Sequence, residues 1–267
     1  MMSSSVGDEA CKKFWSKFSK QCDNRTMMLN ASADQIEAPD RCDILDDLPD
    51  LTGMDIVEVG SGIGRFTGAL AQSASSVLAT DFIEDFVETN QKRNAERGNI
   101  SYRICSATDL KLKESRQVNG EVFASVVDFV FTNWLLMYLS NEEVIAFLQK
   151  TLEWLRPNGY MHIRESCTHA SSGSTTDSLH STQEDNPTQY RYSSVYMQLF
   201  RNIRYKDKMG HLYEFELLWA SSVPTYIIPL DQVLMKYKLP QHANLMICDG
   251  CFLGHSVCVD PQHIAKV

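Results

Sequence analysis

Short apolar runs alternate with polar or amphipathic stretches along the middle of the chain. The apolar runs have the length and the β-branched content of buried strands. They predict strands at residues 54–59, 76–80, 100–105, 126–131 and 160–164. The stretches at 84–97 and 140–155 predict helices, the second with an N-cap signal at Ser140. This alternation is typical of an α/β fold, a doubly wound, mostly parallel sheet with helices on both faces.

The segment before this repeat has a helical pattern. Residues 9–21 and 33–48 predict two helices, the second interrupted near Pro39. We therefore expect residues 1–50 to form an N-terminal helical extension that can act as a lid.

Residues 51–267 are expected to form one domain that carries an insertion at about 167–206. The insertion is rich in Ser, Thr, Asp and Gly, and then in Tyr and Arg. A polar segment of this length in a compact domain predicts a lid-like substrate-binding element. Weak alternation at 213–226 and the sequence at 244–257 predict the last strands.

The strongest local signal follows the first predicted strand. Glycines at 60, 62 and 64 remove side chains where a ligand must approach the backbone. A helical pattern begins at Ile63, and a helix N-terminus offers free N–H groups. Glu58 precedes the glycines, and Asp81 ends the second strand, where a carboxylate can accept both hydroxyls of a ribose.

The spacing E-x-G-x-G-x-G differs from the G-x-G-x-x-G of dinucleotide-binding loops. It favours S-adenosylmethionine as the ligand, with S-adenosylhomocysteine as its product. A nicotinamide or flavin cofactor is the alternative ligand. The remaining alternative is a glycine-lined turn that binds nothing, with a solvated Asp81.

Composition and charge narrow the class of protein. The 267 residues are 43% hydrophobic, which allows a substantial core. The net charge of −9 argues against broad binding to nucleic acid or to an anionic membrane. The sequence has no apolar run of membrane-spanning length and no signal-peptide pattern, so we expect a cytoplasmic protein without stable membrane insertion. The eight cysteines include one C-x-x-C pair, Cys248 and Cys251, and predict reduced thiols and no metal site.

Three blocks outside the glycine loop resemble a known family. They are Thr132–Ser140 (TNWLLMYLS), Arg164–Cys167 (RESC) and Asn186–Arg191 (NPTQYR). With the loop itself, they are similar to the phosphoethanolamine N-methyltransferases, and more closely to the first methyltransferase domain of the plant enzymes and its nematode counterpart. The similarity runs from about residue 12 to residue 258.

The resemblance implies a class I methyltransferase fold (Rossmann-like), with seven strands of which six are parallel and the last is reversed. It implies S-adenosylmethionine as methyl donor and phosphoethanolamine as acceptor. The product is then N-methylethanolamine phosphate, on the route to phosphocholine and phosphatidylcholine. A second methyltransferase domain or protein is an expected partner for the later methylations.

The resemblance also implies which residues hold the donor. Gly60, Gly62 and Arg65 belong to the donor loop, Asp81 contacts the ribose, and Asn133 lies at the mouth of the donor site. Glu58 is expected to orient the loop or to meet the methionine amino group. Relatives carry an adenine-contacting Asp after the third strand. Here a strict match gives Ala107, so either Asp109 or backbone groups at Ala107 and Thr108 make that contact.

The acceptor side is expected to hold the phosphate with Ser166, Ser171, Tyr190 and Arg191. The guanidinium fork of Arg191 suits phosphate oxygens. Methyl transfer to an amine needs a positioned and deprotonated nitrogen. Tyr138 occupies the position where single-domain relatives have a histidine, so it is the candidate catalytic residue that positions the amine.

Two other functions fit the same residues. One is a small-molecule methyltransferase with a carboxylate or hydroxyl acceptor. The other is a non-catalytic member that binds the donor.

Overall fold

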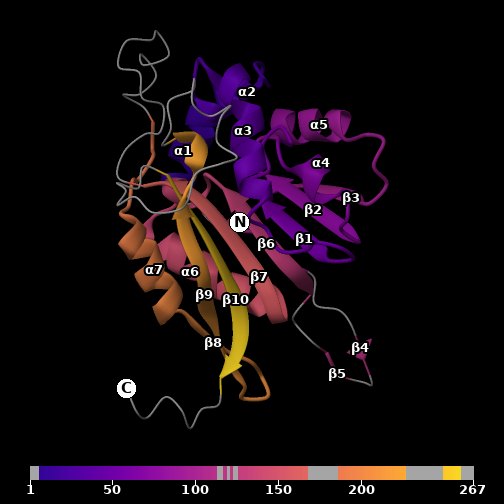
Figure 1. The fold of residues 1–267 in the computed structure, drawn as a ribbon, viewed down its shortest axis with the longest axis vertical. Helices are drawn as coiled ribbons and strands as arrows, with labels where there is room; N and C mark the ends of the chain where they lie inside the picture. The colour runs from indigo at the N-terminus through magenta and orange to yellow at the C-terminus, as the bar shows by residue number, and fades with distance from the viewer. Residues whose placement is uncertain are drawn as a thin grey trace, which may run out of the picture.

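A single mixed sheet lies at the centre of the computed structural model, which describes residues 6–112, 117–118, 121–122, 126–167, 186–226 and 249–259 (Figure 1). The strand order is β3-β2-β1-β6-β7-β10-β9-β8. Five strands are mutually parallel: β1 (Asp55–Val59), β2 (Ser76–Asp81), β3 (Ile100–Ile104), β6 (Val127–Asn133) and β7 (Leu155–Ser166).

The far side of the sheet contains the reversed strand. β10 (Asp249–Val259) pairs antiparallel with both β7 and β9 (Leu212–Ser222). β9 therefore runs in the direction of the five parallel strands, and the predicted arrangement of six strands plus a reversed last strand is confirmed. The three-residue β8 (Arg204–Lys206) adds an eighth strand against β9. The turn between β8 and β9 is stabilised locally, because the Asp207 carboxylate accepts N–H groups from Met209 and His211.

The helices cover both faces of the sheet. They are α1 (Val6–Ser16), α2 (Asn24–Met28), α3 (Ala33–Leu45), α4 (Thr67–Leu70), α5 (Glu84–Arg93), α6 (Asn141–Trp154) and α7 (Ser193–Asn202), with 3₁₀ turns η1 (Leu136–Tyr138) and η3 (Pro224–Tyr226). The short pair β4 (Gln117–Val118) and β5 (Glu121–Val122) stands apart from the main sheet (Figure 1). The N-cap signal at Ser140 is confirmed as a reciprocal capping box with Glu143.

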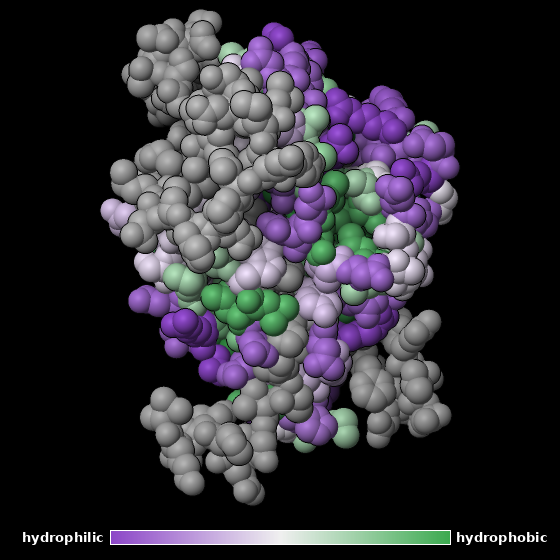
Figure 2. Space-filling view, viewed as in Figure 1, coloured by the Kyte–Doolittle hydropathy of each residue, from purple (hydrophilic) through white to green (hydrophobic). Residues whose placement is uncertain are grey.

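Each face of the sheet has its own apolar core. On one face, Val57, Val130 and Met161 pack against α6 and α7. On the other face, Ile56 and Phe129 pack against α3 and α4. Hydrophilic side chains cover the outer surfaces of α2 and α5 (Figure 2). Within the part of the chain that is described, no helix has the length and apolar character that crossing a membrane requires.

Two local expectations were wrong. The interruption near Pro39 does not occur, because α3 continues through this residue. The missing N–H costs the helix one hydrogen bond, but Ile44 packs in the apolar core of the sheet and Asp40 pairs with Arg164 of β7, and both hold the helix against the sheet.

The second wrong expectation is the helix predicted from Ile63, which begins only at Thr67 and is four residues long. Gly62 and Gly64 have positive φ angles of 51° and 83°, which a continuous right-handed helix excludes. The dipole of so short a helix adds little to the site.

Candidate functional site

The glycine loop lies at the carboxyl end of β1, where the chain turns sharply. Gly60 has a φ of 74°, a conformation that residues with a side chain rarely adopt. A Cβ at Gly64 would lie 2.2 Å from Asn90 Oδ1, so α5 packs directly on the backbone of the loop. Gly64 therefore serves close packing against α5, and the three glycines of the loop are only half-buried.

Glu58 supports this loop from the sheet. Thr67 Oγ1 donates to Glu58 Oε2 at 2.5 Å, and Asn90 Nδ2 donates to Thr67 Oγ1 at 2.8 Å. Burial raises the pKa of Glu58 to about 8, against the lowering effect of the Thr67 bond. Its contacts fit the expected role of orienting the loop; contact with the donor's amino group stays a prediction.

Asp81 closes the same loop from the neighbouring strand. Its carboxylate accepts the N–H of Gly62 and the N–H of Ile83, both at 2.9 Å. Burial raises the pKa of Asp81 to about 6, although these N–H bonds lower it. The structure thus brings together the acidic residue and the glycine loop that the sequence pairs.

Arg65 points away from the glycine loop toward α3. Its guanidinium lies 2.6 Å from Asp40 Oδ2, and the fully buried Arg164 lies 3.0 Å from Asp40 Oδ1. Arg164 also stacks on Trp134, with 3.4 Å from guanidinium carbon to ring centre. One buried carboxylate on α3 therefore links the end of the donor loop to β7.

The turn after β3 holds the residues expected at the adenine. Ala107 packs in the core, whereas Asp109 is exposed and its N–H donates to Ser106 O. The Thr108 carbonyl accepts a hydrogen bond from Lys150 Nζ. Both alternatives for the adenine contact stay predictions.

The segment after β6 carries Asn133, Trp134 and Tyr138. Buried Asn133 Oδ1 and Trp134 Nε1 have no hydrogen-bond partner among the residues that the structure describes. Trp134 has a positive φ of 55°, a strained conformation for an aromatic residue. Unsatisfied polar atoms and strain at the carboxyl end of a strand are features of ligand sites.

The N-terminal helices cover this segment and the glycine loop. Phe14, Trp15 and Phe18 pack with Ile63 and Phe86 in one apolar cluster. The Trp15 ring meets the Tyr138 ring edge-to-face at 5.6 Å. Burial raises the pKa of Tyr138 above its usual value, against a lowering hydrogen bond from Thr188. The phenol is therefore neutral at physiological pH and is suited to positioning an amine by hydrogen bonding.

The residues expected to hold phosphate come together only in part. Ser166 ends β7, and an isolated bridge between Cys167 and Arg191 brings the 186–191 segment beside it. Tyr190 is 37% exposed. Arg191 is buried, and its guanidinium donates to protein acceptors, among them the carbonyls of Leu136 and Leu139. Ser171 lies outside the described residues.

Two residues of the site were missed by sequence reasoning. Asp40 stands between Ile36 and Ile44 on the apolar stripe of α3, and a carboxylate in such a stripe signals a buried ion pair. Glu165 lies near the end of the buried strand β7, and its carboxylate accepts N–H groups from Leu135, Leu136 and Met137.

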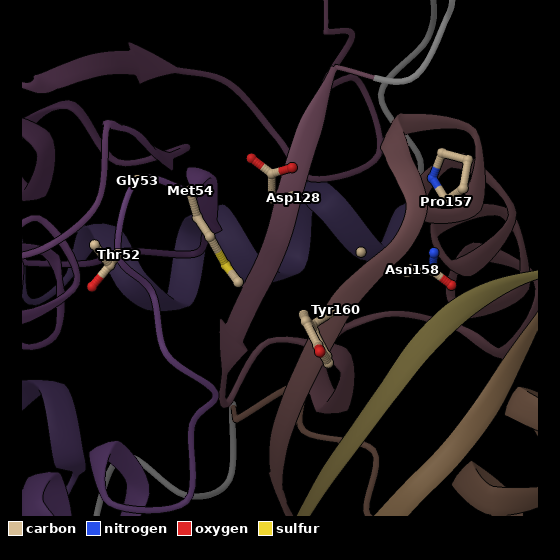
Figure 3. A pocket seen from close by; sticks show the side chains of 8 residues that line it. Thr52, Gly53, Met54, Asp128, Pro157, Asn158 and Tyr160 are labelled. Atoms are coloured by element: carbon tan, nitrogen blue, oxygen red, sulfur yellow. The ribbon is translucent and has the colours of Figure 1, made fainter.

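A pocket of about 270 Å³ lies at the opposite ends of the strands (Figure 3). Its lining comes from the turn before β1 (Thr52, Gly53, Met54), from β6 (Asp128) and from the first part of β7 (Pro157 to Tyr160), where the register of β7 against β6 shifts. None of the predicted site residues lines it. Among the described residues, no group of three His, Cys, Asp or Glu side chains could hold a metal ion.

The sheet order, the reversed strand and the glycine loop with Asp81 define a class I S-adenosylmethionine-dependent methyltransferase. A family model described as "AdoMet dependent proline di-methyltransferase" matches residues 46–214, and the chain belongs to this family.

Individual relatives confirm the resemblance stated from sequence. The phosphoethanolamine N-methyltransferase 1 of Caenorhabditis elegans is 48% identical over 81% of this chain and 44% of its own length. The enzyme of the same name from Triticum aestivum is 35% identical over 81% of this chain and 41% of its own length.

A solved structure of Haemonchus contortus phosphoethanolamine N-methyltransferase 1, in complex with phosphoethanolamine and S-adenosylhomocysteine, matches with a TM-score of 0.81 and 43% identity. The match covers 97% of this chain and 51% of that one. The chain thus spans about half the length of the relatives it matches.

Proposed function

We propose that this chain is an S-adenosylmethionine-dependent N-methyltransferase that acts on phosphoethanolamine. The product would be N-methylethanolamine phosphate, on the route to phosphocholine and phosphatidylcholine. The match to the Haemonchus structure carries the proposal, because it extends over 97% of the chain at 43% identity and that structure holds phosphoethanolamine.

The described residues fit the donor. Gly60 and Gly62 have positive φ angles and no side chain, Asp81 offers a carboxylate beside them, and Asn133 Oδ1 is a buried acceptor without a partner among the described residues. These residues would hold S-adenosylmethionine, which supplies a methyl group activated on a sulfonium. Glu58 would keep the loop in place through Thr67.

On the acceptor side, the chain's own residues would orient the amine and exclude water. The neutral Tyr138 phenol would accept a hydrogen bond from the amine, and the contact of its ring with Trp15 of α1 supports a role in excluding water. Exclusion of water leaves the nitrogen lone pair unsolvated and therefore more reactive. Ser166, Tyr190 and Ser171 remain the predicted phosphate contacts.

A methyl-transfer assay with labelled donor tests the proposal. We expect label on phosphoethanolamine and little on ethanolamine, which lacks the phosphate. The mono- and dimethyl phosphobases in the same assay report how many methylations the chain performs. Donor binding by calorimetry without label on any phosphobase would contradict the proposal and favour a non-catalytic member.

The description of the family model favours a second candidate, methylation of a proline amine. A peptide with N-terminal proline in the same assay separates the two. Label on the peptide, with none on phosphoethanolamine, would replace the first candidate by the second.

The chain spans about half the length of its relatives, which supports a further proposal about its partner. A second methyltransferase domain or protein would complete the later methylations. The cytoplasm remains the location we propose for this activity.

A further inference from the structure

Glu165 holds the segment Leu135–Leu139, which carries Tyr138, through N–H groups at the start of the segment. The N–H groups of Leu135 and Leu136 lie 3.0 and 2.7 Å from Glu165 Oε1, and that of Met137 lies 3.0 Å from Oε2. Glu165 is fully buried, so nearly all of its hydrogen bonding is internal. Three N–H donors on one carboxyl group cap the N-terminal end of η1.

Arg191 holds the other end of the same segment. Its Nη1 donates to Leu136 O at 2.9 Å, and its Nη2 donates to Leu139 O at 2.5 Å. Its Nε donates to Asn141 Oδ1 at 2.9 Å, and the remaining bonds go to Gln189 O and Oε1. A guanidinium has five N–H donors, and these five bonds use all of them.

The two side chains belong to one local unit. Glu165 lies two residues before Cys167, which bridges to Arg191. The neighbouring backbone joins the same contact, because Gln189 N donates to Met137 O at 2.6 Å. Glu165 accepts N–H groups at the start of Leu135–Leu139, and Arg191 donates to two carbonyls of the same segment, so the segment has little freedom to shift.

We propose that Glu165 and Arg191 are positioning residues that fix Leu135–Leu139 and thereby the Tyr138 phenol, and that Arg191 is not a phosphate ligand. The assignment of Arg191 differs from the sequence expectation for a physical reason. A guanidinium with every N–H engaged by protein acceptors has none left to give a phosphate. We call the hold of Glu165 and Arg191 on Leu135–Leu139 the clamp. Its role in methyl transfer rests on the proposed function, whereas the hydrogen bonds of the clamp do not.

Hydrogen exchange tests the clamp without any substrate. The variants are Glu165→Gln and Arg191→Lys, with Arg201→Ala on exposed α7 surface as the matched control. In Glu165→Gln, an amide NH₂ replaces one acceptor oxygen, so exchange at Leu135–Met137 should rise roughly tenfold or more, while α6 interior amides stay unchanged. Unchanged exchange at Leu135–Met137 in both variants would overturn the clamp.

Kinetics with phosphoethanolamine test what the clamp does. We expect Arg191→Lys to lower kcat roughly 10- to 100-fold, because a small displacement of Tyr138 suffices, while KM changes less than about threefold. In a Tyr138→Phe background the same change should cost far less, since both act through one side chain. The control should match wild type.

The opposite pattern would identify a phosphate ligand. A rise in KM of more than about tenfold at unchanged kcat would overturn the assignment of Arg191, as would independent, multiplicative losses with Tyr138→Phe. If the wild type methylates no phosphobase, the proposed function fails, and hydrogen exchange still decides the clamp.

Discussion

At the scale of single residues, the donor loop depends on what lies behind its glycines. Gly64 and Gly53 have similar φ angles, 83° and 73°. Around Gly53 a Cβ would meet nothing within 4 Å, whereas at Gly64 it would meet Asn90 Oδ1 at 2.2 Å. Substitutions at Gly53 and Gly64 therefore distinguish the cost of backbone strain alone from the cost of strain plus steric conflict.

Gly53→Ala should lower the free energy of unfolding by about 1–2 kcal/mol, the cost of the left-handed conformation alone. Gly64→Ala should cost at least about 1 kcal/mol more, because the Asn90–Thr67–Glu58 hydrogen bonds must also shift. Urea unfolding of both variants measures the difference. Equal losses would show that Asn90 yields freely.

The raised pKa of Glu58 predicts how the free energy of unfolding changes with pH. Its pKa rises from 4.5 to about 8 on folding, so the folded state binds this proton more tightly. Its contribution to stability is full below about pH 4.5 and is lost as the pH rises through about 8. The slope is at most about 1.4 kcal/mol per pH unit for one proton.

Glu58→Gln removes this proton, so its unfolding free energy should fall less between about pH 5 and about pH 8.5 than that of wild type. Asp81 and Glu165, whose pKa values are raised to about 6 and about 7, contribute in both proteins. Urea unfolding at each pH gives the two slopes. Parallel slopes would contradict a buried, proton-binding Glu58.

At the scale of elements, α3 is joined to β7 and to the donor loop through Asp40. Removing one partner of a buried ion pair leaves an uncompensated charge, so Asp40→Ala should destabilise the fold by about 3–5 kcal/mol. Asp34→Ala on the same helix removes an exposed pair with Arg25 and should cost less than about 1 kcal/mol. Thermal and urea unfolding compare them. A loss at Asp40 as small as that at Asp34 would show that the two arginines are satisfied otherwise.

The elements also show how far sequence reasoning reaches. Apolar runs predicted β1, β2, β3, β6 and β7 because a buried strand needs a local pattern. The same reasoning extended a helix back to Ile63, because apolar spacing does not report the positive φ of Gly64. It also interrupted α3 at Pro39, because the contacts of Asp40 lie far away in the chain.

The candidate site likewise has features that the local sequence predicts and features that only tertiary contacts determine. Gly62 and Asp81 could be paired from sequence, since Gly62 follows the end of β1 and Asp81 is the last residue of the adjacent parallel strand β2. The surroundings of Arg65 and Arg191 could not be predicted, because Asp40 and the carbonyls of Leu136 and Leu139 meet them only through the fold. The charge of an arginine is visible in the sequence, but its acceptors are not.

At the scale of the whole molecule, the N-terminal helices depend on the rest of the protein for their apolar contacts. Phe14→Ala should make local unfolding of α1 easier than unfolding of the sheet. Phe14 packs with Phe18 and Ile63, in a cluster separate from the two cores of the sheet. Hydrogen exchange should rise roughly tenfold or more at residues 9–21 while β1 and β6 stay protected. Lys13→Ala, an exposed change on the same helix, is the control. Equal increases in hydrogen exchange at residues 9–21, β1 and β6 would mean that the N-terminal helices and the sheet unfold as one unit.

The position of β10 has a consequence for how the protein is made. β10 is the last described strand in the chain, yet it lies between β7 and β9. Until the ribosome has released residues 249–259, one edge of β7 and one edge of β9 lack the strand that pairs with them in the fold. An emerging chain therefore exposes unpaired strand edges to chaperones and to neighbouring chains until that final segment arrives.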